Sequence, residues 1–371
     1  MKKKKTPFLS VCLFLACCCL FLFACSTDGG NQASQNEEET PETNQIQSLN
    51  VPYDVFQKVV GWLSEDTLLV HLGDVEGHTL ISFNIFTGEQ TIIHEDNSYL
   101  LTIDIHESKE RILFQEVFEN ETHLSIITKE GDLLHTTPIP YSGYASIDWN
   151  PMKPELVFVA YYHYDMETEE DEIKVYIWNT DEETVSEKQI LSLAPKWYSA
   201  NVYLYVNERD GNGLYIGDMR EEDSDLLINQ DISDFFLNQD TFIGVVDSDI
   251  SDHQVHLFHE YPLLVSEHAI TIPKVTMNDY LVKPHMTQSQ RDGRIFGVLP
   301  AHSFALEEEI GEYALAELNF EEEVTEEILS LPEDAPILLC PEERYLLYGW
   351  RYESIIDLKS AEIVPLLSDT L

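Results

Sequence analysis

The chain has 371 residues, of which 43% are hydrophobic and 11% aromatic, so it is long enough to bury a sizeable core. It carries 21 Lys and Arg against 68 Asp and Glu, a formal net charge of −47 at pH 7. Such a surface repels nucleic acid and anionic lipid headgroups, so we expect no nucleic-acid partner and no polyanion-binding role.

Residues 1–24 have the features of a secretory signal peptide. Lys2 to Lys5 precede an apolar run from Phe8 to Phe23, and the small residue Ala24 stands directly before Cys25. The alternative is an uncleaved membrane anchor, since about 17 to 25 apolar residues span a bilayer. The run is at the short end of that range and contains four cysteines, which favours cleavage.

The stretch from Leu22 to Cys25 resembles the lipobox of bacterial lipoproteins. Leu22, Ala24 and Cys25 fit that pattern, whereas Phe23 stands where a small residue is usual. The resemblance implies that Cys25 receives a diacylglycerol thioether, that the peptide is cut before it, and that the new amino terminus is acylated. We therefore expect Cys25 to be the lipidation site of a protein anchored at the extracytoplasmic face of the cell membrane.

Loss of this segment changes the composition of the remaining chain. Four lysines leave with it, so 21 − 4 gives 17 basic residues against 68 acidic ones, a charge of −51. Four of the six cysteines leave as well and Cys25 carries lipid, so Cys340 remains alone and no intramolecular disulfide can form. Cys340 follows the apolar residues 337–339, which predicts a small buried hydrophobe rather than a nucleophile.

The sequence predicts three regions: the signal peptide at 1–24, the lipidated cysteine with an acidic flexible linker at 25–48, and a folded domain at 49–371. The linker has almost no side chains to bury. The domain consists of short runs of Val, Ile, Leu, Tyr and Phe separated by turn residues, which is typical of an all-β fold. The exception is Phe304 to Leu318, which suits either a helix or an acidic hairpin insertion.

A repeated unit runs through the folded domain. Each copy has an apolar strand, a polar turn and a second apolar run, and seven copies can be aligned on the residues Leu68, Ile112, Leu156, Val202, Phe242, Ile295 and Leu346. The steps between them are 44, 44, 46, 40, 53 and 51 residues. Repeats of this length that contain several strands indicate a β-propeller, a ring of radially stacked sheets. Such rings avoid an exposed sheet edge, so we expect residues 49–60 to pair with the last unit, 337–367.

The repeats, the lipobox and the acidic linker together resemble the YqgU-like lipoproteins of Gram-positive bacteria. That resemblance implies a six-bladed propeller and no established activity, whereas seven units can be counted here. The number of blades therefore stays open between six and seven at this point.

Sequence motifs predict no metal site and no cofactor. None of the motifs of serine hydrolases, zinc proteases or phosphate-binding loops is present. His253 and His259 would share one face of a strand while His256 points to the other, which disfavours a three-histidine site. The acidic run that begins at Asp247 starts like a calcium loop but has Phe258 where the bidentate glutamate belongs.

Propeller ligands bind where equivalent positions of several blades converge. Asp104 and Asp148 each stand eight residues before an alignment position, and His285 stands ten before another, so these three are the candidate ligand-binding residues. We expect a binding or interaction module whose partner is another envelope protein or a wall component. The alternatives are a propeller hydrolase or lyase acting on envelope polymers and a structural surface protein.

Overall fold

The computed structural model describes residues 45–367 except 120, 142, 166–169, 208–212, 222–224, 239–240 and 260–267. The predicted lipidation site Cys25 and most of the linker lie outside these residues. Every element in the described part is a β-strand, and this part contains no helix of the length and apolar character needed to cross a membrane.

Seven antiparallel four-stranded sheets, called blades 1 to 7 below, are built from strands that follow one another in the sequence. Blade 1 consists of β1 (Phe56–Trp62), β2 (Thr67–Gly73), β3 (His78–Asn84) and β4 (Gln90–Asp96). Blade 2 consists of β5 (Tyr99–Ile105), β6 (Arg111–Phe118), β7 (Glu121–Thr128) and β8 (Leu133–Ile139). Blade 3 consists of β9 (Ser146–Trp149), β10 (Leu156–Asp165), β11 (Glu170–Asn179) and β12 (Thr184–Lys188). Blade 4 consists of β13 (Lys196–Trp197), β14 (Val202–Val206), β15 (Leu214–Asp218) and β16 (Leu226–Asn229).

The remaining blades have the same plan. Blade 5 consists of β17 (Ile232–Asn238), β18 (Thr241–Asp247), β19 (Gln254–His259) and β20 (Ala269–Pro273). Blade 6 consists of β23 (Met286–Gln288), β24 (Ile295–Pro300), β26 (Tyr313–Asn319) and β27 (Val324–Leu331), and blade 7 of β28 (Ile337–Leu339), β29 (Tyr345–Tyr348), β30 (Ser354–Asp357) and β31 (Glu362–Pro365). A small sheet of β21 (Val275–Met277), β22 (Tyr280–Leu281) and β25 (Phe304–Ala305) is inserted beside blade 6.

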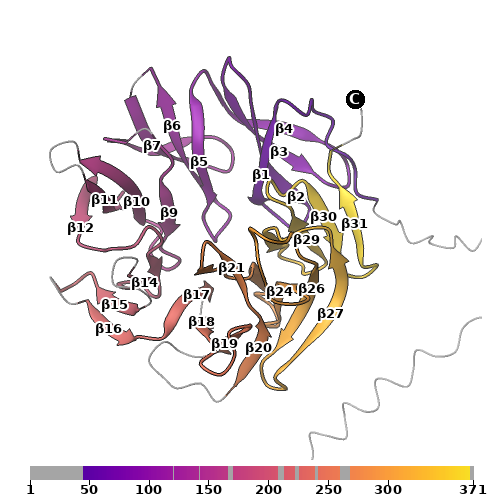
Figure 1. Cartoon of the computed structure of the whole chain (residues 1–371). Coiled ribbons are helices and arrows are strands. Elements are labelled where there is room, and N and C mark those ends of the chain that lie inside the picture. The colour runs from indigo at the N-terminus through magenta and orange to yellow at the C-terminus, as the bar shows by residue number, and fades with distance from the viewer. Residues whose placement is uncertain are drawn as a thin grey trace, which may run out of the picture. The chain divides into compact units, whose positions relative to one another are not determined.

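The blades succeed one another around a common centre (Figure 1). The first strands of neighbouring blades contact each other, as in β1 with β5, β5 with β9, and β9 with β13, so the first strand of each blade is the innermost. The second strands are buried on both faces: all six residues of β24 and all four of β29 are buried. Outer strands such as β4 and β12 are largely exposed, because no further strand covers them.

The predicted β-propeller is therefore confirmed, and seven sheets correspond to the seven counted units. All seven alignment residues lie in the second strands of their blades. The apolar side chains of neighbouring blades form joint clusters, for example Leu113 and Ile126 of blade 2 with Val157 and Val159 of blade 3. Cys340 is a buried free cysteine, as predicted, and burial raises the pKa of its thiol.

Ring closure differs from a shared terminal blade. Strand β1 forms its ladder with β2 of its own blade, and the backbone contacts between this end of the chain and the last unit are local. Leu49 forms a bridge to Leu367, next to the outer strand of blade 7, and the Val59 amide donates a hydrogen bond to the Arg351 carbonyl over 2.9 Å. The Leu49 amide donates a hydrogen bond to the carbonyl of Leu366 over 2.7 Å, and both leucine side chains are fully buried. Side chains of blades 1 and 7 complete the closure, because they form one hydrophobic cluster that includes Phe56 and Tyr345.

The helical alternative for residues 304–318 is wrong. The segment instead contains the short strand β25, a turn, and β26 of blade 6. Gly311 has φ +77°, and a Cβ added at this residue would lie 2.1 Å from the ring of Phe304, so the chain needs glycine at this close approach. Beyond it, Tyr313 and Leu315 are buried two residues apart, which is the period of a strand.

Candidate functional site

The first strands of blades 2 to 5 surround a cavity of about 280 Å³, called the central cavity below. Its polar lining combines both signs of charge, and the charged side chains are those of Asp104, Glu107, Lys109, Asp148 and Lys196. A second cavity of about 350 Å³ shares Lys109, Leu237 and Asn238 with it and extends toward blades 6 and 7. Two of the three candidate ligand-binding residues, Asp104 and Asp148, line the central cavity.

Asp148 holds blades 3 and 4 together. Its Oδ1 accepts a hydrogen bond from Lys196 Nζ over 2.6 Å, and its Oδ2 accepts one from the Trp197 amide over 2.8 Å. The Asp148 carboxylate is the main cause of the raised pKa of Lys196, which keeps this lysine charged. Because both carboxylate oxygens of Asp148 already have partners, its first role is to position Lys196 at the cavity wall.

Asp104 is in a different situation. Among the described residues, its carboxylate accepts one hydrogen bond, from the amide of Ile105, over 2.9 Å. Burial raises the pKa of Asp104 to about 6, the Asp148 charge adds to this rise, and the positive charge of Lys196 opposes it. A carboxyl group whose pKa lies close to neutral pH inside a cavity is a candidate for ligand binding or proton transfer.

Two lysines add positive charge near Asp104. Burial lowers the pKa of both Lys58, on β1, and Lys109, in the turn between β5 and β6, whereas the Asp104 charge raises both pKa values. Within the part of the chain that the structure describes, neither lysine has a carboxylate within 4.0 Å in an ion pair. The ammonium group of Lys109, which lines the central cavity, can therefore meet an anionic group of a ligand.

A second ion pair lies farther round the ring. Lys283 Nζ lies 2.9 Å from Asp234 Oδ1, and the same carboxylate oxygen accepts a hydrogen bond from the Phe235 amide. Asp104 and Asp234 thus share one local structure, a carboxylate that binds the next amide of a first strand.

Sequence reasoning missed several of these residues. Asp234 stands eight residues before Phe242, so the spacing that identified Asp104 and Asp148 also identifies it. The lysines had no such signal, because Lys196 stands six residues before its alignment position and Lys58 ten before its own. Only the structure shows that their ammonium groups approach Asp104 and Asp148.

His285 does not belong to the central cavity. Its Nε2 lies 3.9 Å from Asp334 Oδ1, and its ring meets the Trp350 ring edge-on at a centroid distance of 5.6 Å. Burial is the main cause of the lowered pKa of His285. The structure therefore brings together two of the three candidate residues and places the third between blades 6 and 7.

The chain was compared with known protein families and structures. The model of the YqgU-like 6-bladed beta propeller domain matches residues 84–349. The chain is 24% identical over 364 residues to the uncharacterized lipoprotein YqgU of Bacillus subtilis, covering 97% of this chain and 98% of that protein.

Solved structures of similar fold include the uncharacterized protein lmo1340 of Listeria monocytogenes, with a TM-score of 0.78, 19% identity, and coverage of 88% of this chain and 99% of that one. An oligogalacturonate lyase in complex with manganese has a TM-score of 0.56 at 10% identity, covering 82% of this chain and 86% of that one. At these identities the structural likeness shows the fold alone.

The matched range begins at the end of β3 and ends just after β29, so it contains blades 2 to 6 complete, one strand of blade 1 and two strands of blade 7. Five whole sheets and three further strands amount to about six blades, although the described chain builds seven. With most of the chain matched by the family model and a full-length relative named as a lipoprotein, the chain belongs to the YqgU-like β-propeller family.

Proposed function

We propose that the protein is a lipid-anchored binding module of the cell envelope, held at the extracytoplasmic face by lipid on Cys25, and that the central cavity is its ligand site. The single observation that carries the ligand site is the set of charged groups around Asp104. The mature chain has 17 basic residues against 68 acidic ones, yet three lysines interact electrostatically with this one carboxyl group. The Asp104 charge raises the pKa of Lys58 and of Lys109, and the positive charge of Lys196 lowers the pKa of Asp104.

The ligand that suits this cavity carries both an anionic and a cationic group. Lys109 offers an ammonium group without an ion-pair partner among the described residues, and Asp104 offers a carboxyl group with one amide donor. Peptides of wall polymers carry free carboxyl and amino groups, and they fit both charges. The two tryptophans of the cavity wall define its shape and do not offer an exposed ring on which a ligand could stack. Trp149 and Trp197 are buried, and their indole N–H groups donate hydrogen bonds to backbone carbonyls.

Binding of soluble wall fragments tests the ligand site. The full-length protein, purified in detergent, is titrated calorimetrically with fragments released from peptidoglycan by a muramidase. We expect Lys109→Met and Asp104→Asn to weaken binding by about ten-fold or more, because each removes one charged contact inside a partly dehydrated site. Lys129→Met is the matched control, since Lys129 pairs with Glu110 at an exposed turn of the same blade. Equal binding by all four proteins, or no binding by the unmodified one, contradicts the proposal.

The anchor is tested separately by labelling cells with a fatty acid that can be detected after purification. The unmodified protein is expected to take up the label and to fractionate with membranes, because the thiol of Cys25 carries the diacylglycerol group. Cys25→Ala is expected to take up none. Equal labelling of the two proteins contradicts lipidation without affecting the proposal for the cavity.

A second candidate function, a hydrolase or lyase acting on envelope polymers, is favoured by one observation. Asp104, with a pKa of about 6, and Lys109, with a pKa lowered by burial, are groups of the kind that transfer protons in catalysis. New reducing ends in a polymer incubated with the unmodified protein, absent with Asp104→Asn, would support this function over binding alone. Unchanged polymer after prolonged incubation would count against it.

A further inference from the structure

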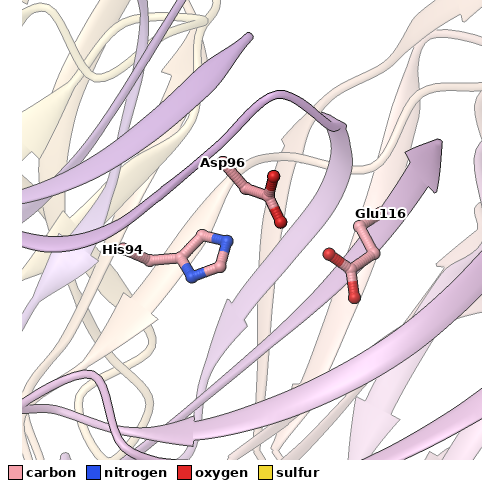
Figure 2. A group of neighbouring side chains, drawn as sticks. All are labelled: His94, Asp96 and Glu116. Carbon is pink, nitrogen blue, oxygen red and sulfur yellow. The ribbon is translucent and has the colours of Figure 1, made fainter.

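A group of metal-ligating side chains lies outside the central cavity, between blades 1 and 2. His94 and Asp96 stand on β4, the outer strand of blade 1, and Glu116 stands on β6 of blade 2. One ligand atom from each of the three residues lies within 4.8 Å of the other two. Figure 2 shows the imidazole and the two carboxylates pointing toward one another from these two strands.

The local structure explains why these side chains meet. His94 pairs with Leu80 and Asp96 with His78, so the two residues are two positions apart in a regular part of β4 and share one face. Glu116 is two positions beyond Phe114 on β6, and the His94 ring packs on the Phe114 ring at a centroid distance of 4.6 Å. The packing of the two blades therefore presents the imidazole to Glu116.

Two features of the group indicate a ligand. His94 Nε2 is buried and has no hydrogen-bond partner among the described residues. In Figure 2 this ring nitrogen is the one that faces the carboxylates. Buried polar atoms in native proteins nearly always have a hydrogen-bond or metal partner, so we expect a ligand to bind this nitrogen. Glu116 is already oriented, because its Oε1 accepts a hydrogen bond from Ser125 Oγ over 2.7 Å, an arrangement typical of metal-ligating carboxylates.

We infer that His94, Asp96 and Glu116 bind a divalent transition-metal cation of the Zn²⁺ or Mn²⁺ type, which joins blade 1 to blade 2. A neutral imidazole nitrogen prefers such ions to Ca²⁺ or Mg²⁺, and carboxylates complete their coordination together with water. Ligands of one such ion lie about 3 to 4 Å apart, given metal–ligand distances of about 2.0 to 2.2 Å. The exposed Asp96 side chain can move the remaining distance of about 1 Å by rotating at the end of its strand.

The site is distinct from the central cavity, so this inference does not depend on the proposed function. It is tested with the full-length protein in detergent, first stripped of metal with a chelator and then titrated with ZnCl₂ or MnCl₂. We expect one ion per chain and a rise in the melting temperature, because binding to the folded state alone stabilises it. His94→Gln and Glu116→Gln are expected to lower the affinity by about ten-fold or more.

Glu95→Gln is the matched control. Glu95 lies between His94 and Asp96 on the same strand, is exposed, and points to the other face, so its replacement should leave the affinity unchanged. Glu116→Gln keeps an oxygen for the Ser125 hydroxyl; should it nevertheless fail to fold, Asp96→Asn, at an exposed position, gives the same test. Absence of stoichiometric uptake, equal weakening by Glu95→Gln, or tighter binding of Ca²⁺ than of Zn²⁺ and Mn²⁺ would overturn the inference.

Discussion

At the residue scale, the ionised form of Asp104 lowers the stability of the folded protein at neutral pH, because its carboxyl group lies in the central cavity rather than in water. The pKa of its carboxyl group is about 6 in the folded protein, against a reference value of 3.8. The folded state therefore binds a proton more tightly than the unfolded chain, so the contribution of Asp104 to stability is fully present below about pH 4 and is lost as the pH rises through 6. A carboxyl group retained at such a position is better explained by binding or chemistry than by packing.

We predict that Asp104→Asn stabilises the protein at neutral pH and not in acid. The difference in melting temperature between the variant and the unmodified protein should be small near pH 4 and should grow as the pH rises to 7, where it corresponds to about 2 to 3 kcal/mol. His71 acts in the opposite direction, since burial and His78 lower its pKa to about 3, but it is common to both proteins and cancels in the difference. A difference that is constant from pH 4 to 7 would contradict the raised pKa.

The spacing in the sequence identified Asp104 and Asp148 and would also have identified Asp234, but it carries no signal for the lysines. In blades 2, 3 and 5 an aspartate lies on the first strand, eight residues before the alignment residue on the second strand. These aspartates are Asp104, Asp148 and Asp234. The lysines reach the cavity from other positions on long side chains, whose paths depend on the packing of neighbouring blades. Lys109, for example, comes from the turn after β5.

At the element scale, the second strands were predictable because they are buried on both faces and so read as continuous apolar runs. The outer strands were not: β12 is almost entirely exposed, and β13 has only two residues. The first strand also gave a misleading signal for ring closure. Its hydrophobic residues pack against blade 7 as side chains, whereas its backbone ladder is with β2, and the Val59 amide alone donates a single hydrogen bond to blade 7, at the Arg351 carbonyl.

Leu366 takes part in both a backbone contact and the hydrophobic cluster that close the ring, so we predict that it is a sensitive position. Leu366→Ala removes a fully buried side chain from the cluster between blades 1 and 7, so we expect a loss of about 3 kcal/mol and a lower melting temperature. Glu362→Ala, at an exposed position on β31, should change stability by less than about 0.5 kcal/mol. The double variant Leu49→Ala/Leu366→Ala should lose less than the sum of the two single losses, since the residues are partners. Strict additivity would show that the two chain ends are not coupled.

At the scale of the whole molecule, charge sets the conditions under which the ring is stable. The full chain has a formal net charge of −47, and the expected loss of residues 1–24 with their four lysines would make it −51. Acidic groups lie exposed on outer strands, as Glu326 and Glu327 do on β27, so their mutual repulsion acts on the compact folded state more strongly than on an expanded chain. The same charge keeps the domain away from anionic headgroups, which is why the proposed location depends on a lipid rather than on surface adsorption.

Salt should therefore stabilise the protein. Exposed charges interact over a screening length of about 30 Å in 0.01 M salt and only about 3 Å in 1 M salt, so added NaCl weakens the repulsion that opposes compaction. We expect the melting temperature to rise by several degrees between 0.01 and 0.5 M NaCl at pH 7, and to rise much less at pH 4, where many of the carboxylates are protonated. Because NaCl acts here through screening, KCl at equal ionic strength should give the same rise. A melting temperature that falls with added salt would mean that the ion pairs between blades, such as Asp148 with Lys196, outweigh the repulsion between the acidic surfaces.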